Sequence, residues 1–166
     1  MQPTHSHLNL SPGLDSETQI IAKRNLVEVL RKALAQRSYL PGLLNIGSAT
    51  DRYQPAGREL RLTRGLIELM GEVRHPCSLV TKSGGVERDL ELIAPMAAQK
   101  LAAVHGTVTT LDAGLERKPE PRAAAPYRRL RTIERLAQAG VPVGVSVAPQ
   151  IRFVNNDWKK VLEATG

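Results

Sequence analysis

Lys82 is the strongest candidate for chemistry in this sequence of 166 residues. It comes directly after the apolar run Cys77–Val80 and lies between Thr81 and Ser83. A lysine at the end of a buried strand is expected to face a site rather than bulk water. There its ammonium could bind a carboxylate or a phosphate, or form a Schiff base if its pKa is lowered. The alternative is a lysine whose stem lies along apolar surface while its charge reaches solvent.

Two carboxylates, Asp51 and Asp112, follow other apolar runs in the same way. They could hold ribose hydroxyls, act as a base, or cap the helices that follow. A phosphate-binding loop is not predicted, because Ser83-Gly84-Gly85 lacks the spacing of the known glycine-rich fingerprints. No metal site is predicted either. His5 and His7 have no further ligand spaced to complete one, and Cys77 is the single cysteine.

Four short apolar runs, each followed by turn-forming polar residues, predict the buried strands that must position these side chains. The runs are Leu43–Ile46, Cys77–Val80, Ala103–Val108 and Val141–Val147. An amphipathic helical pattern follows each run, and the spacing of about thirty residues is typical of βα units with parallel strands. The carboxyl ends of parallel strands share one edge of the sheet, so we expect the site at that edge.

Hydrophobic periodicity predicts the helices that connect and follow these strands. They cover residues 25–37, 62–73, 86–101, 126–139 and 156–164. Asn25 and Glu28 resemble a capping box at the start of the first helix, and Pro95 is expected to kink or split the third. The whole chain, 1–166, is interpreted as one α/β domain with an irregular segment at 1–17.

The helix predicted at 126–139 has two faces. Its inward face is expected to carry Leu130, Ile133, Leu136 and Ala137, and its outward face Arg128, Arg129, Arg131 and Arg135. The net charge of +7 favours anionic partners, whereas aromatic residues are only 3% of the chain and supply little stacking surface for nucleic acid. No apolar run approaches the ~18 residues that cross a bilayer, and no signal peptide is visible, so we expect a cytoplasmic protein without a membrane partner.

Five motifs in order on successive βα units resemble the radical S-adenosylmethionine (SAM) superfamily, in particular the branch related to spore photoproduct lyase. The motifs are GSATDRYQP (47–55), LVTKS (79–83), TVTTLD (107–112), KPEPR (118–122) and SVAPQI (146–151). The resemblance covers nearly the whole chain. It implies a partial (βα) barrel of parallel strands that holds SAM and a [4Fe–4S] cluster, whose electron releases a carbon radical from SAM.

The resemblance also implies which residues bind SAM. Lys82 matches a lysine that contacts the SAM carboxylate, and Thr107 stands where the branch usually has a serine facing SAM. Ala148 and Pro149 match a backbone segment beside the adenine. Ser48, Thr50 and Asp51 match the polar end of the strand at 43–46. The catalytic residues stay unknown.

The sequence departs from the superfamily at the cluster. The three cysteines of CxxxCxxC belong on the loop after the first strand, and both the loop and that strand are missing here. Arg152-Phe153 replaces the usual Pro-Gly, and Ala49 and Arg52 stand where Asn and Pro are common. Without three thiolates no such cluster can form, so this chain alone is expected to lack radical activity.

Three functions remain open at this stage. The first is a radical SAM protein, a lyase in its intact form, with DNA repair suggested by analogy only. The second is a degenerate barrel that binds nucleic acid through the four arginines of 126–139. The third is a cofactor-free enzyme that uses Lys82 as a Schiff-base nucleophile.

The first function makes a prediction that genomic sequencing tests. If Met1 is not the true start, the DNA upstream of its codon encodes, in the same frame, a strand and three cysteines at the cluster spacing. A stop codon close upstream without such cysteines would instead favour a shortened relative.

Overall fold

The computed structural model describes residues 22–47, 53, 61–112, 114, 124–150 and 155–165. Several expectations fall outside these ranges, namely those for 1–17, Ser48, Ala49, Thr50, Asp51, Arg52, 118–122 and 152–153. Within the described ranges, no helix combines the length and the apolar character needed to cross a membrane.

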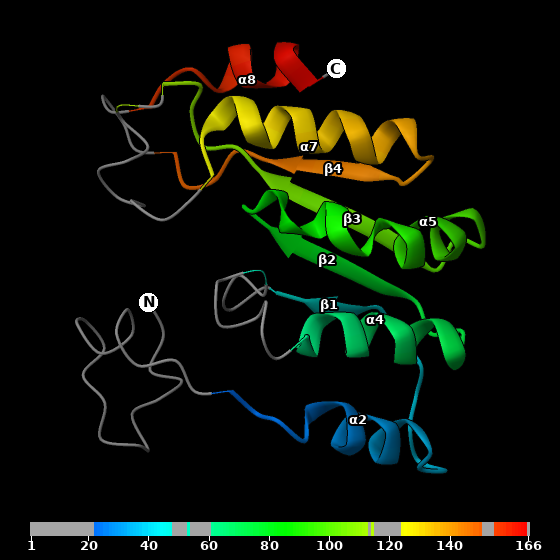
Figure 1. Ribbon diagram of the computed structural model, residues 1–166. Helices are drawn as coiled ribbons and strands as arrows, with labels where there is room; N and C mark the ends of the chain where they lie inside the picture. The colour runs from blue at the N-terminus through cyan, green and yellow to red at the C-terminus, as the bar shows by residue number, and fades with distance from the viewer. Residues whose placement is uncertain are drawn as a thin grey trace, which may run out of the picture.

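Four parallel strands form one sheet, and their order in space follows their order in the chain (Figure 1). They are β1 (Leu44–Ile46), β2 (Cys77–Thr81), β3 (Ala102–Thr107) and β4 (Val143–Ser146). Each overlaps a predicted apolar run, so the α/β class and the parallel pairing are confirmed. Four strands in a row do not by themselves close a barrel, and the partial (βα) barrel stays a prediction.

Helices α4, α5 and α7 lie on one face of this sheet, while α2 lies beside α4 and α8 beside α7 (Figure 1). The bounds are α2 Leu26–Leu34, α4 Leu62–Glu72, the 3₁₀ helix η2 Gly84–Asp89, α5 Leu90–Ala98, α7 Pro126–Gln138 and α8 Trp158–Thr165. The local sequence explains both ends of α7. Pro126 occupies its first turn, where a missing N–H costs little, and Gly140 beyond its last turn adopts φ +75°.

The face of the sheet under the helices carries the apolar core. Leu79 of β2 and Val104 of β3 are fully buried there. They belong to the same cluster as Met70 of α4, Ile93 of α5 and Leu136 of α7. Alternation along a strand sends every second side chain to this face, so each strand needs only a few apolar residues to bury it.

The opposite face of the sheet, called the polar face below, has a different composition. Its positions alternate with the core positions and are Asn45, Ser78, Val80, Ala103, His105, Thr107, Gly144 and Ser146. All but Val80 are small or polar. A sheet face that packs under helices is rich in Val, Ile and Leu. The polar face is therefore not built to pack under an apolar helix.

The start and end of α2 differ from the prediction. The helix ends at Leu34 rather than near Arg37, and the capping box does not form. Asn25 makes no side-chain capping hydrogen bond, because its φ of −89° and ψ of 14° lie outside the extended region that a capping residue normally adopts. Glu28 instead accepts a hydrogen bond from Lys32, at 2.7 Å.

Pro95 does not split the helix that contains it. It lies inside α5, and the change from 3₁₀ to α geometry occurs earlier, at Asp89–Leu90. The carbonyl that loses its partner amide at Pro95 belongs to Glu91, and both residues are exposed. Water can satisfy that carbonyl, so the proline is tolerated.

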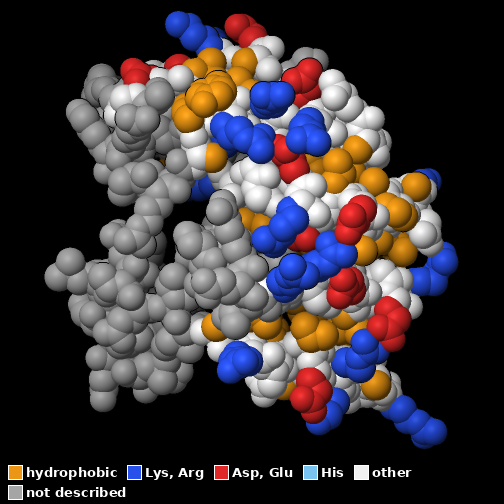
Figure 2. Space-filling view, in the orientation of Figure 1, with side chains coloured by type: hydrophobic (Ala, Val, Ile, Leu, Met, Phe, Trp, Pro, Cys, Tyr) orange, Lys and Arg blue, Asp and Glu red, His pale blue; other side chains and the backbone are white. Residues whose placement is uncertain are grey.

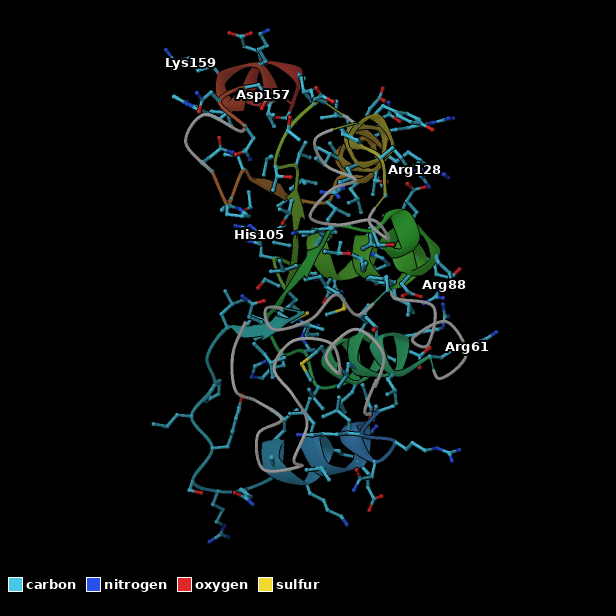
Figure 3. All side chains as sticks on the ribbon, turned by 90° about the vertical axis from the view of Figure 1, so that its left-hand side faces the viewer. Arg61, Arg88, His105, Arg128, Asp157 and Lys159 are labelled. Atoms are coloured by element: carbon cyan, nitrogen blue, oxygen red, sulfur yellow. The ribbon has the colours of Figure 1, made fainter. Side chains whose placement is uncertain are left out.

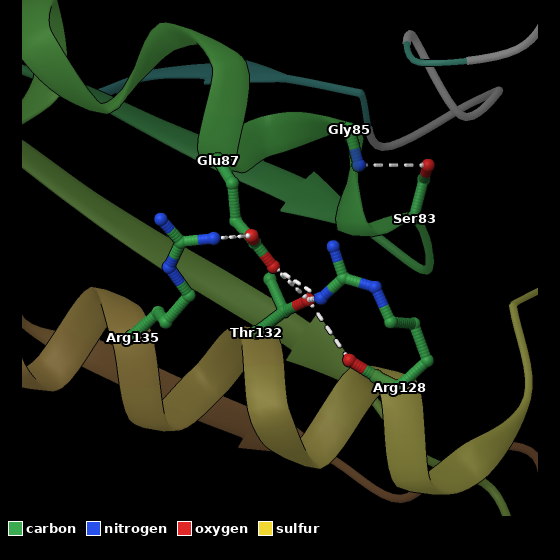
Figure 4. Close-up of polar contacts among 6 residues, drawn as sticks. All are labelled: Ser83, Gly85, Glu87, Arg128, Thr132 and Arg135. Carbon is green, nitrogen blue, oxygen red and sulfur yellow. Dashed lines mark hydrogen bonds and ion pairs between the residues drawn. The ribbon is translucent and has the colours of Figure 1, made fainter.

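Glu87 ties η2 to α7 (Figure 4). Its Oε1 accepts hydrogen bonds from Arg128 and from the Thr132 hydroxyl, and its Oε2 accepts one from Arg135 at 2.7 Å. Burial by itself would raise the pKa of this carboxyl, but the bonds from Arg128 and Thr132 hold the pKa below its ordinary value. The carboxylate therefore stabilises the fold above its unfolded-state pKa, and this contribution is lost as the pH falls through the lowered folded-state pKa.

We expect Glu87→Gln to lower the free energy of unfolding by about 1.5–3 kcal/mol at neutral pH, since it removes a charge that accepts three hydrogen bonds. Urea denaturation measures this. Glu72→Gln is the matched control, because its pair with Arg31 is exposed and is worth about 0–1 kcal/mol. The Glu87 effect should shrink at acidic pH. Equal effects of the two substitutions at neutral pH would contradict this role of Glu87.

Candidate functional site

The carboxyl ends of β2 and β3 bring two predicted site residues together. Lys82 and Thr107 line one crevice between the sheet and α7. Ser83 contributes from the end of β2, and Arg129 and Thr132 contribute from α7. The crevice has room for about one water molecule. It is a joint between elements rather than a ligand cavity, so a ligand of Lys82 and Thr107 has to lie outside it.

Two successive side-chain turns shape the backbone around Lys82. The Thr81 hydroxyl accepts a hydrogen bond from the Ser83 amide at 2.9 Å, and the Ser83 hydroxyl accepts one from the Gly85 amide at 3.1 Å. The second bond caps the start of η2. Hydroxyl residues two positions before such amides are the usual signal for these turns. Lys82 is thus held at the tip of a defined turn, half-buried.

Arg129 is buried, with 3% of its surface exposed, so its expected place on the outward face of the helix is wrong. Its Nη1 donates to the carbonyl of Thr107 at 2.9 Å, and its Nε donates to the carbonyl of Ala124 at 2.8 Å. The guanidinium therefore connects the last residue of β3 to the segment that leads into α7.

The inward face of α7 is rotated relative to the prediction. Its buried residues are Pro126, Arg129, Thr132, Ile133 and Leu136, whereas Leu130 is half-buried and Ala137 is exposed. The first turn of α7 lies beside the end of β3, where backbone carbonyls need donors. A planar guanidinium with several N–H groups satisfies two of them at once, which a leucine in that place cannot do.

The four-arginine surface expected on α7 is therefore reduced. Arg129 is buried, Arg128 and Arg135 both pair with Glu87, and Arg131 is exposed. Figure 2 shows acidic and basic side chains interspersed over the face that the helices present. Neutralised arginines attract a phosphate backbone less than unpaired ones do.

Side-chain amides connect the loops that follow β3 and β4. Asn155 donates from Nδ2 to the carbonyls of Thr109 and Pro149, at 3.1 and 3.0 Å, and Gln150 donates to the same Thr109 carbonyl at 3.2 Å. Ala148 and Pro149, the residues implied for adenine binding, are exposed at this rim. Both loops are thus held together at the edge of the sheet where the site is expected.

Asp157 adds a further connection that the sequence interpretation missed. Its Oδ2 accepts hydrogen bonds from the Thr110 hydroxyl and the Leu111 amide, both at 2.8 Å, immediately before α8 begins. Burial would raise the pKa of this carboxyl, but these two bonds lower it below its ordinary value. Its stabilising effect is present above the unfolded-state pKa and is lost as the pH falls through the folded-state value. An aspartate directly before a helix was the available signal.

The contacts of Asp112 favour a capping role. Its Oδ1 accepts a hydrogen bond from the Gly114 amide at 2.7 Å, and its own amide donates to the Thr110 hydroxyl at 3.1 Å. These are local turn interactions. They support the capping interpretation of this residue over the interpretation as a ribose ligand or a base.

Cys77 has the properties of a structural thiol. It begins β2, at the end of the sheet opposite Lys82, and is 1% exposed. Burial raises the pKa of the thiol to about 11, which keeps it protonated, whereas a metal ligand has to be a thiolate. The part of the chain that the structure describes contains no group of three or more His, Cys, Asp or Glu side chains suited to a metal ion.

The chain is similar to several curated proteins that carry no assigned function. An uncharacterized protein of Mycobacterium tuberculosis is 35% identical over 148 residues, which are 89% of this chain and 44% of the relative. One of Methanocaldococcus jannaschii is 22% identical over 80% of the chain and 48% of the relative. An uncharacterized protein of Acidianus two-tailed virus is 29% identical over 84% of this chain and 46% of the relative.

The chain thus spans about half the length of the curated relatives it matches. No family model matches it. No solved structure matches it either. Proteins similar to this chain therefore occur in a bacterium, an archaeon and a virus.

We expect Arg129→Lys to lower the free energy of unfolding by about 1–3 kcal/mol, because a single ammonium group cannot occupy the positions of both Nε and Nη1, and one buried carbonyl then loses its donor. The matched control is Arg131→Lys on the exposed face, for which a change within about 0.5 kcal/mol is expected. Urea denaturation of the two variants measures the difference. Unfolding midpoints that shift equally would show that the buried contacts of Arg129 do not matter.

Proposed function

We propose that this chain forms the SAM-binding part of a radical SAM-type protein, organised as a partial (βα) barrel. One observation carries the proposal: Lys82 and Thr107, which the motifs assign to SAM, lie together at the carboxyl edge of adjacent parallel strands. This edge is where open α/β sheets bind their ligands. The order of the five motifs along the chain supports the same function.

The residues at the rim suit the chemistry of SAM. In this proposal the Lys82 ammonium pairs with the carboxylate of the methionyl group, and Thr107 orients the ligand above β3. Ala148 and Pro149 offer exposed backbone to the adenine, beside a loop that Asn155 and Gln150 hold in place.

The buried Arg129 supports this assignment by its position. Its guanidinium lines the same crevice as Lys82, near the ends of β2 and β3. Arg129 also holds the Thr107 carbonyl, and so acts as a positioning residue for that end of β3.

The described residues do not fit the iron–sulfur cluster. Three thiolates cannot come from a sequence with one cysteine, and Cys77 lies buried at the far end of β2. In this proposal the cluster ligands belong to a longer chain or to a partner. The whole protein would be a lyase-like enzyme, and DNA as its substrate rests on analogy alone.

The two other functions have less support. Nucleic-acid binding was assigned to four arginines, of which Arg129 is buried and two share Glu87. A Schiff base on Lys82 remains chemically open, and it makes a distinct expectation: borohydride would trap a carbonyl substrate on Lys82 without SAM.

We expect Lys82→Ala to weaken binding of S-adenosylhomocysteine, a stable SAM analogue that keeps the carboxylate. A charge-assisted hydrogen bond shielded from water is worth about 1.5–3 kcal/mol, on the order of tenfold to a hundredfold in Kd. Titration of the ¹⁵N-labelled chain followed by NMR measures Kd even for weak binding.

Arg131→Ala is the control for this titration. Arg131 is exposed on α7, and its substitution removes one positive charge, as Lys82→Ala does. Its Kd should equal that of the unaltered chain. Equal weakening by both substitutions would indicate a general charge effect. An analogue that binds neither form, or binds regardless of Lys82, would exclude the proposed site.

A further inference from the structure

The amino-terminal ends of the four strands lie together at the end of the sheet opposite Lys82 (Figure 1). In Figure 3 the carboxyl ends of the strands face the viewer, so this other end lies behind the sheet. The chain enters the strands there through four connections, called the amino-edge surface below. They are residues 35–43, 73–76, 99–101 and 139–142. The proposed function makes no use of this end of the fold.

Apolar side chains project from the amino-edge surface. In the connection between α2 and β1, Leu40 is 87% exposed and Leu43 is 68% exposed, and Val73 in the next connection is 42% exposed. A Cβ added at Gly42, between the two leucines, would meet nothing within 4 Å, so this loop extends into solvent. Exposed apolar groups that gather in one place mark a contact surface, whereas single scattered ones do not.

The base of the loop with the two leucines is fixed to the fold. His75 donates from Nδ1 to the carbonyl of Pro76 at 3.0 Å, so its Nε2 accepts the hydrogen bond from the Tyr39 hydroxyl at 2.7 Å. The Leu44 amide donates to the same Pro76 carbonyl at 3.1 Å. Residues on both sides of the leucines are therefore held, and the leucines project from a defined place.

The charged residues of the amino-edge surface are all cations. Arg37, Arg74 and Lys100 are exposed, and none of them forms an ion pair within the part of the chain that the structure describes. The four connections contain no Asp or Glu. Arg74 and Lys100 follow the ends of α4 and α5, where the helix dipole favours a cation. The dipole accounts for these two charges, but it does not account for exposed leucines beside them.

Projecting apolar side chains among cations suit an anionic lipid surface. Apolar side chains that enter the headgroup region are removed from water, and each cation near anionic headgroups adds attraction. A lipid leaflet accepts such side chains in any arrangement, whereas a protein partner has to supply a pocket that matches them. A nucleic acid would pair with the cations and leave the leucines in water.

We infer that the amino-edge surface docks on a membrane that contains anionic phospholipids, with Leu40 and Leu43 entering the headgroup region and the three cations facing lipid phosphates. Contact of this kind needs no spanning helix. It departs from the expectation of a chain without a membrane partner, which rested on spanning runs and a signal peptide alone. Lys82 lies at the opposite end of the sheet, so the inference goes beyond the proposed function and does not depend on it.

The test is cosedimentation of the 166-residue chain with vesicles of phosphatidylcholine, prepared with and without phosphatidylglycerol. Binding should require phosphatidylglycerol and should weaken as the salt concentration rises. Leu40→Ala and Leu43→Ala should each weaken binding about tenfold, since each removes apolar surface that the lipid buries. Arg37→Ala should weaken it about fivefold, which corresponds to one cation at an anionic surface.

The matched controls are Leu162→Ala and Arg131→Ala, which change an exposed leucine on α8 and an exposed arginine on α7. Neither should change vesicle binding. Entry into the lipid has a separate readout. Trp158 is the only tryptophan, so Leu40→Trp in a Trp158→Phe background places a single fluorophore on the loop. Its emission should shift to shorter wavelength when vesicles of phosphatidylglycerol are added.

Three outcomes would overturn the inference. The first is no binding to vesicles that contain phosphatidylglycerol. The second is binding that depends on Arg37 but on neither leucine, because the contact is then electrostatic only. The third is competition by poly-glutamate that depends on the same leucines, which would indicate an acidic protein partner instead. None of these outcomes concerns the titration with S-adenosylhomocysteine, so the proposed function is tested separately.

Discussion

The buried guanidinium of Arg129 is the contact on which the edge of the sheet depends. It donates to the carbonyl of Thr107, where β3 ends, and to that of Ala124, where the chain leads into α7. The loop that follows Thr107 carries Thr109, whose carbonyl accepts hydrogen bonds from Asn155 and Gln150. Without the guanidinium, the Thr107 carbonyl at the end of β3 would lose its buried donor, and the loop that follows β3 would be held less firmly.

The four arginines of α7 have different partners. Arg129 donates hydrogen bonds to backbone carbonyls, Arg128 and Arg135 form ion pairs with Glu87, and Arg131 is exposed. A net charge of +7 therefore gives no direct measure of the charge that this helix offers to a partner. Ion pairs and burial decide which cations a partner can reach.

The two faces of the sheet follow from alternation along each strand. Leu79 and Val104 send apolar groups toward the helices, and their neighbours send small or polar groups the other way. One face therefore drives folding by burial, whereas the other is mostly small and polar. The ends of the strands, where both faces meet the loops, are where Lys82 and Thr107 lie.

Local signals in the sequence determined the elements and their order. Apolar runs before polar turns located the four strands that the structure describes, and periodicity with Pro126 and Gly140 located α7 almost to the residue. These signals act within a few residues, because strand burial, turns and caps depend on near neighbours. The place of Lys82 at the end of β2 was predictable for the same reason.

Only the tertiary structure decided the roles of Arg129 and Asp157. Arg129 depends on carbonyls at the end of β3 and before α7, and Asp157 depends on a loop that lies 46 residues away in the sequence. An amphipathic pattern predicts every arginine on the solvent-facing side of a helix, because the pattern does not show which backbone carbonyls nearby need a donor. Which polar groups are buried is settled by the hydrogen bonds that distant segments provide.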